Sequence, residues 1–368
     1  MRVLSVFGTR PEAIKMAPVI AELGRRGSKF DSRVCVTAQH REILDQVLTL
    51  FSIEPNIDLD LMTPEQTLSD LTARSMQALT GVLQDTQPDI VLVQGDTTTV
   101  MAAALAAFYE HIPVGHVEAG LRTGDRYRPF PEEINRRLAD VLSSVYFAPT
   151  QTAAQALLRE GVPEASIHVT GNTVIDALLT VTSQPEPGTL AELLDEIGTA
   201  RLVLVTAHRR ENFGAPFEEI CRGLRELVHR NDDLVLVYPV HPNPNVREPV
   251  FRHLQDEPGI HLIDPLPYAE FSHLMNRASL ILTDSGGIQE EAPALGKPVL
   301  VLRRETERPE AVEAGTVRLI GPDAEAIVQK SELLLNDAGE YQRMARAISP
   351  YGDGHAAEKI VDVLDRGW

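Results

Sequence analysis

The feature that most constrains the fold of this chain is a regular alternation of short apolar runs with longer helical patterns. Ten runs have the length and the β-branched content of buried strands. These runs are Val3–Phe7, Arg33–Thr37, Ile90–Gln94, Pro113–Val117, Val145–Ala148, Leu202–Thr206, Leu234–Tyr238, Ile260–Ile263, Leu280–Thr283 and Val299–Leu302. Helical patterns such as Pro11–Arg25, Leu68–Gln84 and Thr99–Glu110 lie between them. Because nearly continuous apolar strands are typical of parallel sheets covered on both faces, the pattern predicts an α/β fold.

The alternation is broken at Thr182–Gly188 (TSQPEPG), where two prolines and a glycine follow a helical segment. A length of 368 residues also suits two domains of ordinary size. We therefore predict two Rossmann-like doubly wound domains that face a cleft, one over residues 1–181 and one over 182–354. A second break at Ser349–Gly354 (SPYGDG) would let the last helix, within 355–368, pack back on the first domain. In such sheets, ligands bind beyond the carboxyl ends of the strands.

Composition and charge exclude several classes of partner. Acidic residues outnumber basic ones 53 to 34, for a formal net charge of -19, which disfavours binding to nucleic acid or to an anionic membrane. The two cysteines, Cys35 and Cys221, are too few for a disulfide framework or a cysteine-built metal site. The sequence contains neither a signal-peptide pattern nor an apolar stretch of about 18 residues. We expect a soluble cytoplasmic protein that binds no metal.

Polar residues follow the predicted strands of the first half. Arg10 and Lys15 begin a helix after a glycine turn, where they would bind a phosphate or remain as surface charges. Asp96 and Glu118 follow two later strands and make a plausible acid/base pair, because two like charges close together can keep one carboxyl protonated. Helix capping is the alternative role for Asp96. Capping explains Glu132, which lies before the next helix, equally well.

The second half contains two stronger signals for a phosphate ligand. His208–Arg210 places a histidine and two arginines at the end of a strand, which favours a polyphosphate site over a solvated basic loop. Ser285–Gly287 precedes a helix, and its glycines would let the backbone and the helix N-terminus approach a diphosphate. Glu291, one turn later, would accept hydrogen bonds from ribose hydroxyls, and Arg308 would close the same pocket. A plain capped helix is the alternative.

These segments together resemble the non-hydrolysing UDP-N-acetylglucosamine 2-epimerases. The resemblance covers nearly the whole chain, in order and without large gaps. The matching motifs are FGTRPEAIKMAP, TAQHREILDQ, QGDTTT, HVEAGLRTGD, PEEINR, TGNTVIDAL, AHRRENFG, YPVHPNPNVREPV, LTDSGGIQEEAPALGKPVL, ERPEAVEAGTVRL and PYGDG.

The resemblance implies a glycosyltransferase-B-like fold, a homodimer, and no nicotinamide or metal cofactor. It also implies reversible conversion of UDP-GlcNAc to UDP-ManNAc through UDP elimination and a 2-acetamidoglucal intermediate, in the biosynthesis of cell-surface polysaccharides. By the family pattern, the catalytic residues are Asp96, Glu118, Glu132 and His208. The residues that bind the substrate and its UDP group are Arg10, Lys15, Phe271, Ser285, Gly286, Gly287, Glu291 and Arg308.

Bacterial members of this family are often activated by UDP-GlcNAc bound beside the active site. The polar residues that match this allosteric site are Gln39, Glu42, Glu132, Arg209 and His241. Some members have a glutamine in place of Glu42 and an arginine in place of Glu65. Both changes put negative charge toward an anionic ligand, which weakens the case for allosteric binding here.

Three other functions compete with epimerisation. A retaining glycosyltransferase of the same fold would need an acceptor pocket, and the paired strand-end carboxylates favour an epimerase instead. A bifunctional hydrolysing epimerase would need a sugar kinase, for which 368 residues leave no room, although a hydrolytic outcome stays open. A non-catalytic nucleotide-sugar sensor would be expected to have lost Asp96 or Glu118, and both are acids here.

Overall fold

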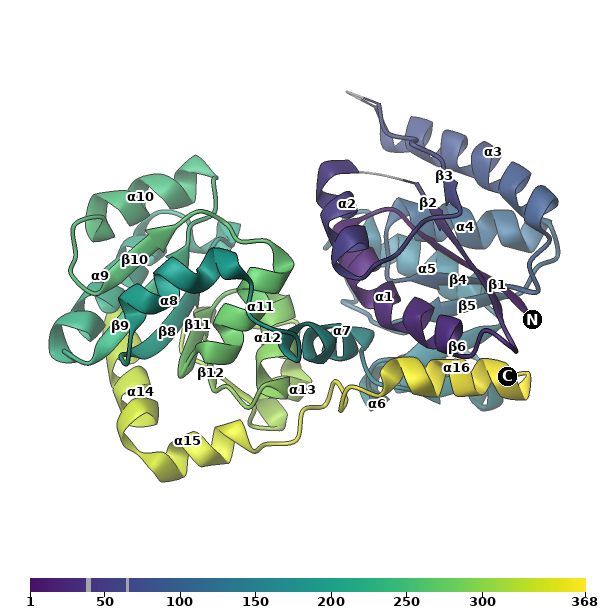
Figure 1. The fold of residues 1–368 in the computed structure, drawn as a ribbon. Helices are drawn as coiled ribbons and strands as arrows, with labels where there is room; N and C mark the ends of the chain where they lie inside the picture. Colours follow the sequence, from purple (N-terminus) through teal and green to yellow (C-terminus); the bar gives the residue numbers. More distant parts are fainter. Residues whose placement is uncertain (38–40, 64–65) are drawn as a thin grey trace. The chain divides into compact units, whose positions relative to one another are not determined.

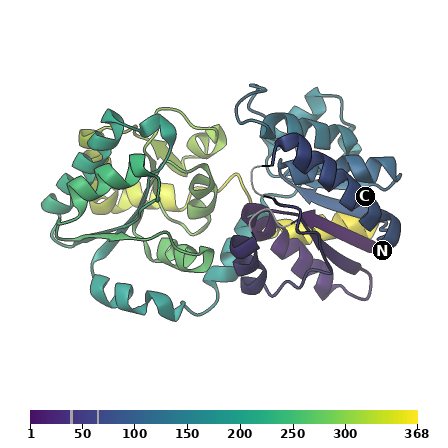
Figure 2. The same ribbon diagram turned by 90° about the horizontal axis from the view of Figure 1, so that it is seen from above.

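The structure is a computed structural model that describes residues 1–37, 41–63 and 66–368. The chain divides into two compact units (Figure 1). Unit 1 comprises Met1–Ala177 and Tyr351–Trp368, and unit 2 comprises Leu178–Pro350. The first crossing falls within helix α7 (Thr173–Thr182), just before the proline-rich segment. Helices lie on both faces of the sheet in each unit (Figure 2).

Unit 1 is built on a parallel seven-stranded sheet with the order β3-β2-β1-β4-β5-β6-β7. The strands are β1 (Arg2–Phe7), β2 (Asp31–Val36), β3 (Ile57–Asp58), β4 (Ile90–Gln94), β5 (Val114–Val117), β6 (Val145–Ala148) and β7 (Ile167–Val169). The helices are α1 (Arg10–Arg25), α2 (Arg41–Leu50), α3 (Leu68–Thr86), α4 (Thr98–Tyr109), α5 (Glu132–Leu142), α6 (Gln151–Arg159), α7 and α16 (Ala356–Arg366). The strand order reverses between β1 and β4, which is where such sheets bind ligands.

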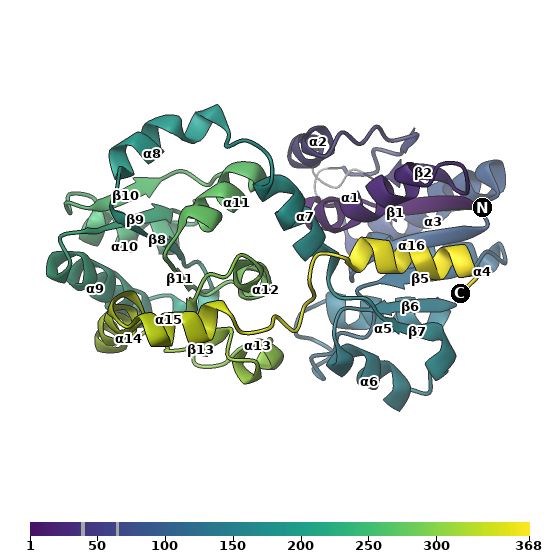
Figure 3. The ribbon, with the colours of Figure 1, turned by 60° about the horizontal axis from the view of Figure 1, so that its bottom comes forward.

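Helix α16 completes unit 1 although it follows unit 2 in the chain. It packs along α1 (Figure 3). Its N-terminus is held by the buried carboxylate of Asp176 on α7, which accepts hydrogen bonds from the N–H groups of Ala356 at 3.2 Å and Ala357 at 2.8 Å. A carboxylate at a helix N-terminus satisfies donors that have no partner within the helix.

Unit 2 is built on a parallel six-stranded sheet with the order β10-β9-β8-β11-β12-β13, which reverses between β8 and β11. The strands are β8 (Arg201–Thr206), β9 (Leu234–Pro239), β10 (Ile260–Ile263), β11 (Leu280–Thr283), β12 (Val299–Val301) and β13 (Val317–Leu319). The helices are α8 (Ala191–Ile197), α9 (Ala215–Arg230), α10 (Pro244–Leu254), α11 (Tyr268–Arg277), α12 (Gly286–Ala294), α13 (Pro309–Glu313), α14 (Ala324–Asn336) and α15 (Ala338–Ala345).

The prediction of two doubly wound parallel sheets is confirmed. All ten predicted strands are present, and the sheets contain three further strands, β3, β7 and β13, that the sequence did not predict. Each of these three lies at an edge of its sheet. Within the described ranges, none of the helices has the length and apolar character needed to cross a membrane.

Candidate functional site

In unit 1, one buried carboxylate ties together the two turns at the point where the strand order reverses. Glu12 accepts hydrogen bonds from the N–H groups of Gly8 at 3.1 Å and Thr9 at 2.7 Å, which follow β1. Its other oxygen accepts a hydrogen bond from the Thr97 hydroxyl, after β4, at 2.7 Å. Burial raises the pKa of Glu12 above its ordinary value. Arg10, the first residue of α1, is exposed at this turn.

Each of the two predicted acid/base residues has a cationic partner of its own. Asp96 follows β4, has 29% of its side chain exposed and forms an ion pair with Arg136 of α5. Glu118 follows β5, has 10% of its side chain exposed and forms an ion pair with Lys15 of α1. Glu118 also has a φ of +67°, in the left-handed region that non-glycine residues seldom adopt. Such strained backbone is often found at functional sites.

The structure overturns the capping alternative for Asp96. Thr97, not Asp96, is the N-cap of α4, and its hydroxyl accepts a hydrogen bond from the Val100 N–H at 3.3 Å. Glu132 is the first residue of α5, and the N-cap position before it is occupied by Pro131, which makes no side-chain capping bond. Its neighbour Glu133 is the buried one. The Glu133 carboxylate accepts hydrogen bonds from two backbone N–H groups of the preceding loop.

Part of the predicted allosteric set lies outside what the structure describes. This applies to Gln39, to the side chain of Glu42 and to Glu65. The two members on unit 2, Arg209 and His241, are described, and both lie beside residues of the predicted UDP site.

In unit 2, the buried carboxylate of Asp284 organises the loop after β8. It accepts hydrogen bonds from the N–H groups of Arg209 at 2.8 Å and His208 at 2.9 Å. It also accepts a hydrogen bond from the Asn212 amide at 3.0 Å. Asp284 therefore fixes the backbone from which the His208 and Arg209 side chains extend. Asp284 and Asn212 were not among the predicted site residues, although an acid directly between a buried strand and a Ser-Gly-Gly turn is a signal for the first of them.

His208 lies against a second histidine ring. The His208 and His241 ring centroids are 5.4 Å apart, with 18° between the ring planes. Burial of the His208 ring lowers its pKa, and the electrostatic interactions with His241 and Arg209 add to this effect against the opposing carboxylate of Asp284. The neutral form of His208 is therefore favoured, and an anionic ligand nearby would raise its affinity for a proton.

The N-terminus of α12 forms a cationic recess. A Cβ atom added to the buried Gly286 would lie 3.6 Å from Arg209 Nη2 and 3.9 Å from Arg308 Cζ. Both guanidinium groups therefore face the start of this helix. The N-cap residue, Ser285, makes no side-chain capping bond. Backbone N–H groups and two arginines at a helix N-terminus form a site suited to phosphate.

The remaining predicted UDP-binding residues of unit 2 lie on α12, on α11 and just before α13. Glu291, on α12, is buried and accepts a hydrogen bond from the Tyr268 hydroxyl at 3.3 Å. Burial raises the pKa of Tyr268 well above its ordinary range, so this hydroxyl stays a donor. Phe271 lies three residues further along α11 and is partly buried. Arg308 forms an ion pair with Glu290 of α12. Tyr268 was not among the predicted site residues.

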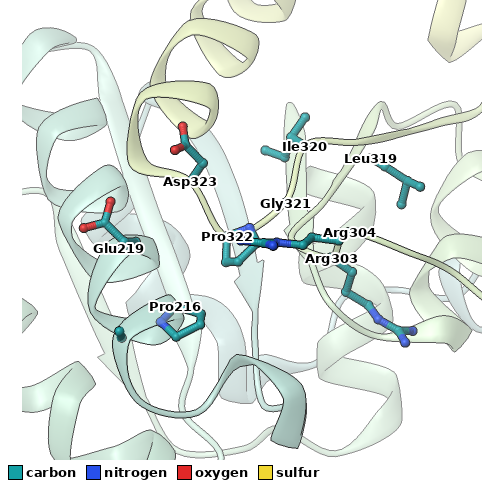
Figure 4. Close-up of a pocket in the computed structure, with 10 residues that line it drawn as sticks. Pro216, Glu219, Arg303, Arg304, Leu319, Ile320, Gly321, Pro322 and Asp323 are labelled. Carbon is teal, nitrogen blue, oxygen red and sulfur yellow. The ribbon is translucent and has the colours of Figure 1, made fainter.

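A separate pocket of about 540 Å³ lies beyond the ends of β12 and β13 (Figure 4). Its lining includes two arginines and two acids, and Arg303 is engaged by both oxygens of Glu211 at 2.5 and 3.1 Å. The lining residues are Ala215, Pro216, Glu219, Arg303, Arg304, Leu319, Ile320, Gly321, Pro322 and Asp323. None of the predicted UDP-binding residues is among them, and the balanced charge gives a diphosphate no excess of cations to bind. No group of three or more candidate metal ligands occurs in the described part of the chain.

Comparison with known proteins identifies the family. The family model described as UDP-N-acetylglucosamine 2-epimerase matches residues 22–365. The chain belongs to the UDP-N-acetylglucosamine 2-epimerase family. This family member is 56% identical to the UDP-N-acetylglucosamine 2-epimerase of Escherichia coli K12, over 99% of this chain and 98% of that protein.

Two solved structures show how closely the epimerase fold is shared. The UDP-GlcNAc 2-epimerase of Neisseria meningitidis, bound to UDP-GlcNAc, is 50% identical, with a TM-score of 0.88 and complete coverage of both chains. The UDP-GlcNAc 2-epimerase of Methanocaldococcus jannaschii is 36% identical, also with a TM-score of 0.88 and complete coverage. The predictions of the epimerase family and of a glycosyltransferase-B-like α/β fold are confirmed.

Proposed function

We propose that this chain is a UDP-N-acetylglucosamine 2-epimerase that interconverts UDP-GlcNAc and UDP-ManNAc without hydrolysis. The observation that carries the proposal is the placement of Asp96 and Glu118 at the carboxyl ends of the adjacent parallel strands β4 and β5. Two carboxylates at neighbouring strand ends suit proton transfer at a carbon centre. The names of full-length relatives at 50% identity and above agree with this activity.

We assign the UDP group to the recess at the start of α12 in unit 2. Its diphosphate would lie at Ser285, Gly286 and Gly287, between the guanidinium groups of Arg209 and Arg308. Both guanidiniums lie within contact distance of a Cβ atom added to Gly286, which supports this assignment. The buried Glu291 would bind the ribose, and Phe271 would lie by the uracil. From the family resemblance, we also assign Arg10 and Lys15 of unit 1 to nucleotide binding.

The chemistry explains why the site needs both a phosphate recess and carboxylates. The C2 hydrogen of the sugar is not acidic in the ground state, since no carbonyl group adjoins it. When UDP begins to leave C1, positive charge develops there and the C2–H bond becomes acidic. His208 and the arginines stabilise the departing diphosphate, and His208 can acquire a proton as negative charge approaches it. A carboxylate then takes the C2 proton, which leaves UDP and 2-acetamidoglucal.

The reverse steps complete the inversion. UDP adds back to C1 while a proton is delivered to the opposite face of C2. Two faces require two proton-transfer groups, a role for Asp96 and Glu118, with Glu132 as a third carboxylate.

The positions of Arg209 and His241 bear on the allosteric prediction. Arg209 lies at the diphosphate recess, and His241 stacks on His208. Both therefore suit the active site itself as well as a second UDP-GlcNAc site beside it. We further propose, from the family resemblance, a cytoplasmic homodimer that needs no metal or nicotinamide cofactor and supplies cell-surface polysaccharide synthesis.

Proton NMR of UDP-GlcNAc with the enzyme in deuterated water tests the proposal. We expect both UDP-GlcNAc and UDP-ManNAc to be recovered with deuterium at C2. Full retention of the original hydrogen would refute proton abstraction at C2. Free N-acetylmannosamine together with UDP would instead indicate a hydrolysing enzyme.

A further inference from the structure

A fully buried histidine on β5 has an acceptor against each of its ring nitrogens. His116 Nε2 lies 2.7 Å from the Gly95 carbonyl oxygen, and its Nδ1 lies 2.6 Å from Asp140 Oδ1. A neutral imidazole has one N–H donor and one lone pair. In this geometry its lone pair would face an oxygen lone pair at hydrogen-bond distance. A protonated Asp140 could donate to a neutral ring instead, but burial of Asp140 is outweighed by the neighbouring positive charges, Arg122 among them, which lower its pKa and keep it ionised. Both ring nitrogens therefore donate, and His116 is an imidazolium.

The charges around His116 support this assignment. Asp140, on α5, is buried, and its second carboxylate oxygen lies 2.7 Å from Arg122 Nη2. Arg122 in turn forms an ion pair with Glu160 at 2.7 Å. Burial alone would lower the pKa of His116, but the Asp140 carboxylate outweighs it and the pKa is raised. The result is a row of alternating charges, in which each buried ion is paired.

His116 holds the backbone of the turn from which Asp96 extends. Gly95 has a φ of +81°, and its carbonyl accepts the His116 hydrogen bond. The Gly95 N–H donates to the Val117 carbonyl at 3.0 Å, one residue before Glu118. The turn after β4 is therefore attached to β5 through both the N–H and the carbonyl of Gly95.

We propose that His116 is a positioning residue, which fixes the Asp96 turn relative to the strand end of Glu118 through its hydrogen bond to the Gly95 carbonyl. The inference rests on the proposed epimerisation, because that reaction uses both carboxylates on one C2 atom. The hydrogen bonds and ion pairs of this network all lie within unit 1, whereas the diphosphate recess belongs to unit 2. Loss of His116 should therefore reduce kcat and leave UDP binding intact, because small misplacements of reacting groups cost rate steeply.

The charge state can be measured directly on the wild-type protein. With ¹⁵N-labelled histidine, we expect NMR to show both ring nitrogens of His116 protonated at pH 8, where an ordinary histidine is neutral. A single protonated nitrogen would overturn the assignment. This measurement needs no variant, so it remains decisive even if a substitution at His116 prevents folding.

Three variants test the positioning role. We expect His116→Gln to lower kcat roughly 10- to 100-fold, with the KM and the UDP dissociation constant unchanged. Asp140→Asn should lower kcat less than His116→Gln does. When the ring is charged, the new amide oxygen can accept a hydrogen bond from Nδ1. When the ring is neutral, the amide N–H can donate to Nδ1, and in both cases Nε2 can still donate to Gly95. The matched control is Tyr146→Phe, which removes a buried hydroxyl bonded to the Asp140 carbonyl at 2.8 Å without touching the turn. An unchanged kcat in His116→Gln, or an equal fall in Tyr146→Phe, would refute the proposal.

Hydrogen exchange separates this inference from the proposed function. The Gly95 amide should exchange faster in His116→Gln than in the wild type, whatever reaction the protein catalyses. Failure of the wild type to epimerise UDP-GlcNAc would disprove the function alone. An unchanged Gly95 exchange rate in the variant would disprove the positioning role alone.

Discussion

Substitution of Gly286 by alanine tests the binding of UDP without disturbing the fold. The added methyl would lie 3.6 Å from Arg209 Nη2 and 3.9 Å from the Arg308 guanidinium, which are ordinary contact distances. The backbone of Gly286 also lies outside the left-handed region, so alanine can adopt it. The fold therefore has no need of glycine here. A ligand that approaches the N-terminus of α12 between the two arginines does need that space.

The expected effects can be estimated from these distances. Replacing a glycine by alanine where the backbone permits it stabilises a protein by about 0.4–1 kcal/mol. A phosphate oxygen hydrogen-bonded to Arg209 would lie about 2.9 Å from its nitrogen, in the region that the methyl occupies. Loss of one hydrogen bond to a charged group costs about 1.5–3 kcal/mol. We therefore expect UDP affinity to fall about 10- to 140-fold, at about 1.4 kcal/mol per factor of ten.

Calorimetric titration with UDP and thermal unfolding measure the two effects on the same sample. Gly81→Ala is the matched control, because it lies in α3 of unit 1 and its added methyl would have no heavy atom within 4 Å. The control should bind UDP like the wild type. If Gly286→Ala also binds UDP with wild-type affinity, the diphosphate does not lie at the start of α12, and the assigned recess is wrong.

Two further predictions concern the proposed catalytic groups. Asp96→Asn and Glu118→Gln should each lower turnover by roughly 10²-fold or more while calorimetry shows UDP binding retained, because only the ionisable group is lost; near-normal rates would make both residues structural. Because the pKa of His208 is lowered by burial, the unfolded chain binds its proton more tightly, and this group destabilises the fold as pH falls below about 6.5. In urea unfolding, the free energy of unfolding of the wild type should therefore fall relative to that of His208→Gln as the pH is lowered from 7 to 5. A difference that stays constant would contradict the lowered pKa of His208.

The central strands were predictable from the sequence, whereas three of the four edge strands, β3, β7 and β13, were not, for a physical reason. Central strands such as β4 are buried on both faces and are apolar almost throughout. The edge strands β3 and β7 have two and three residues and contain none that is fully buried. These strands therefore lack the continuous apolar run that predicts a buried strand, and only pairing with a neighbouring strand defines them.

The candidate reactive residues stand out in the sequence, whereas the buried groups that hold them do not. Asp96 and His208 stand at strand ends, where a polar side chain after an apolar run is conspicuous. Glu12, His116 and Asp284 act through backbone groups of turns that come together only in the folded sheet. A sequence shows that such a residue is polar, but not which N–H or carbonyl it will meet. The capping explanation of Asp96 failed for the same reason, since the choice between neighbouring residues depends on where the helix begins.

The return of α16 to unit 1 has a consequence for synthesis of the chain. Unit 2, of roughly 170 residues, is continuous, whereas unit 1 lacks α16 until all of unit 2 has left the ribosome. At about 5–20 residues per second, the apolar face of α1 that α16 covers stays open for roughly 10–35 s after the rest of unit 1 has been made. The N-terminal unit is thus the last to be completed, and a nascent chain stalled near residue 350 would present that face to chaperones.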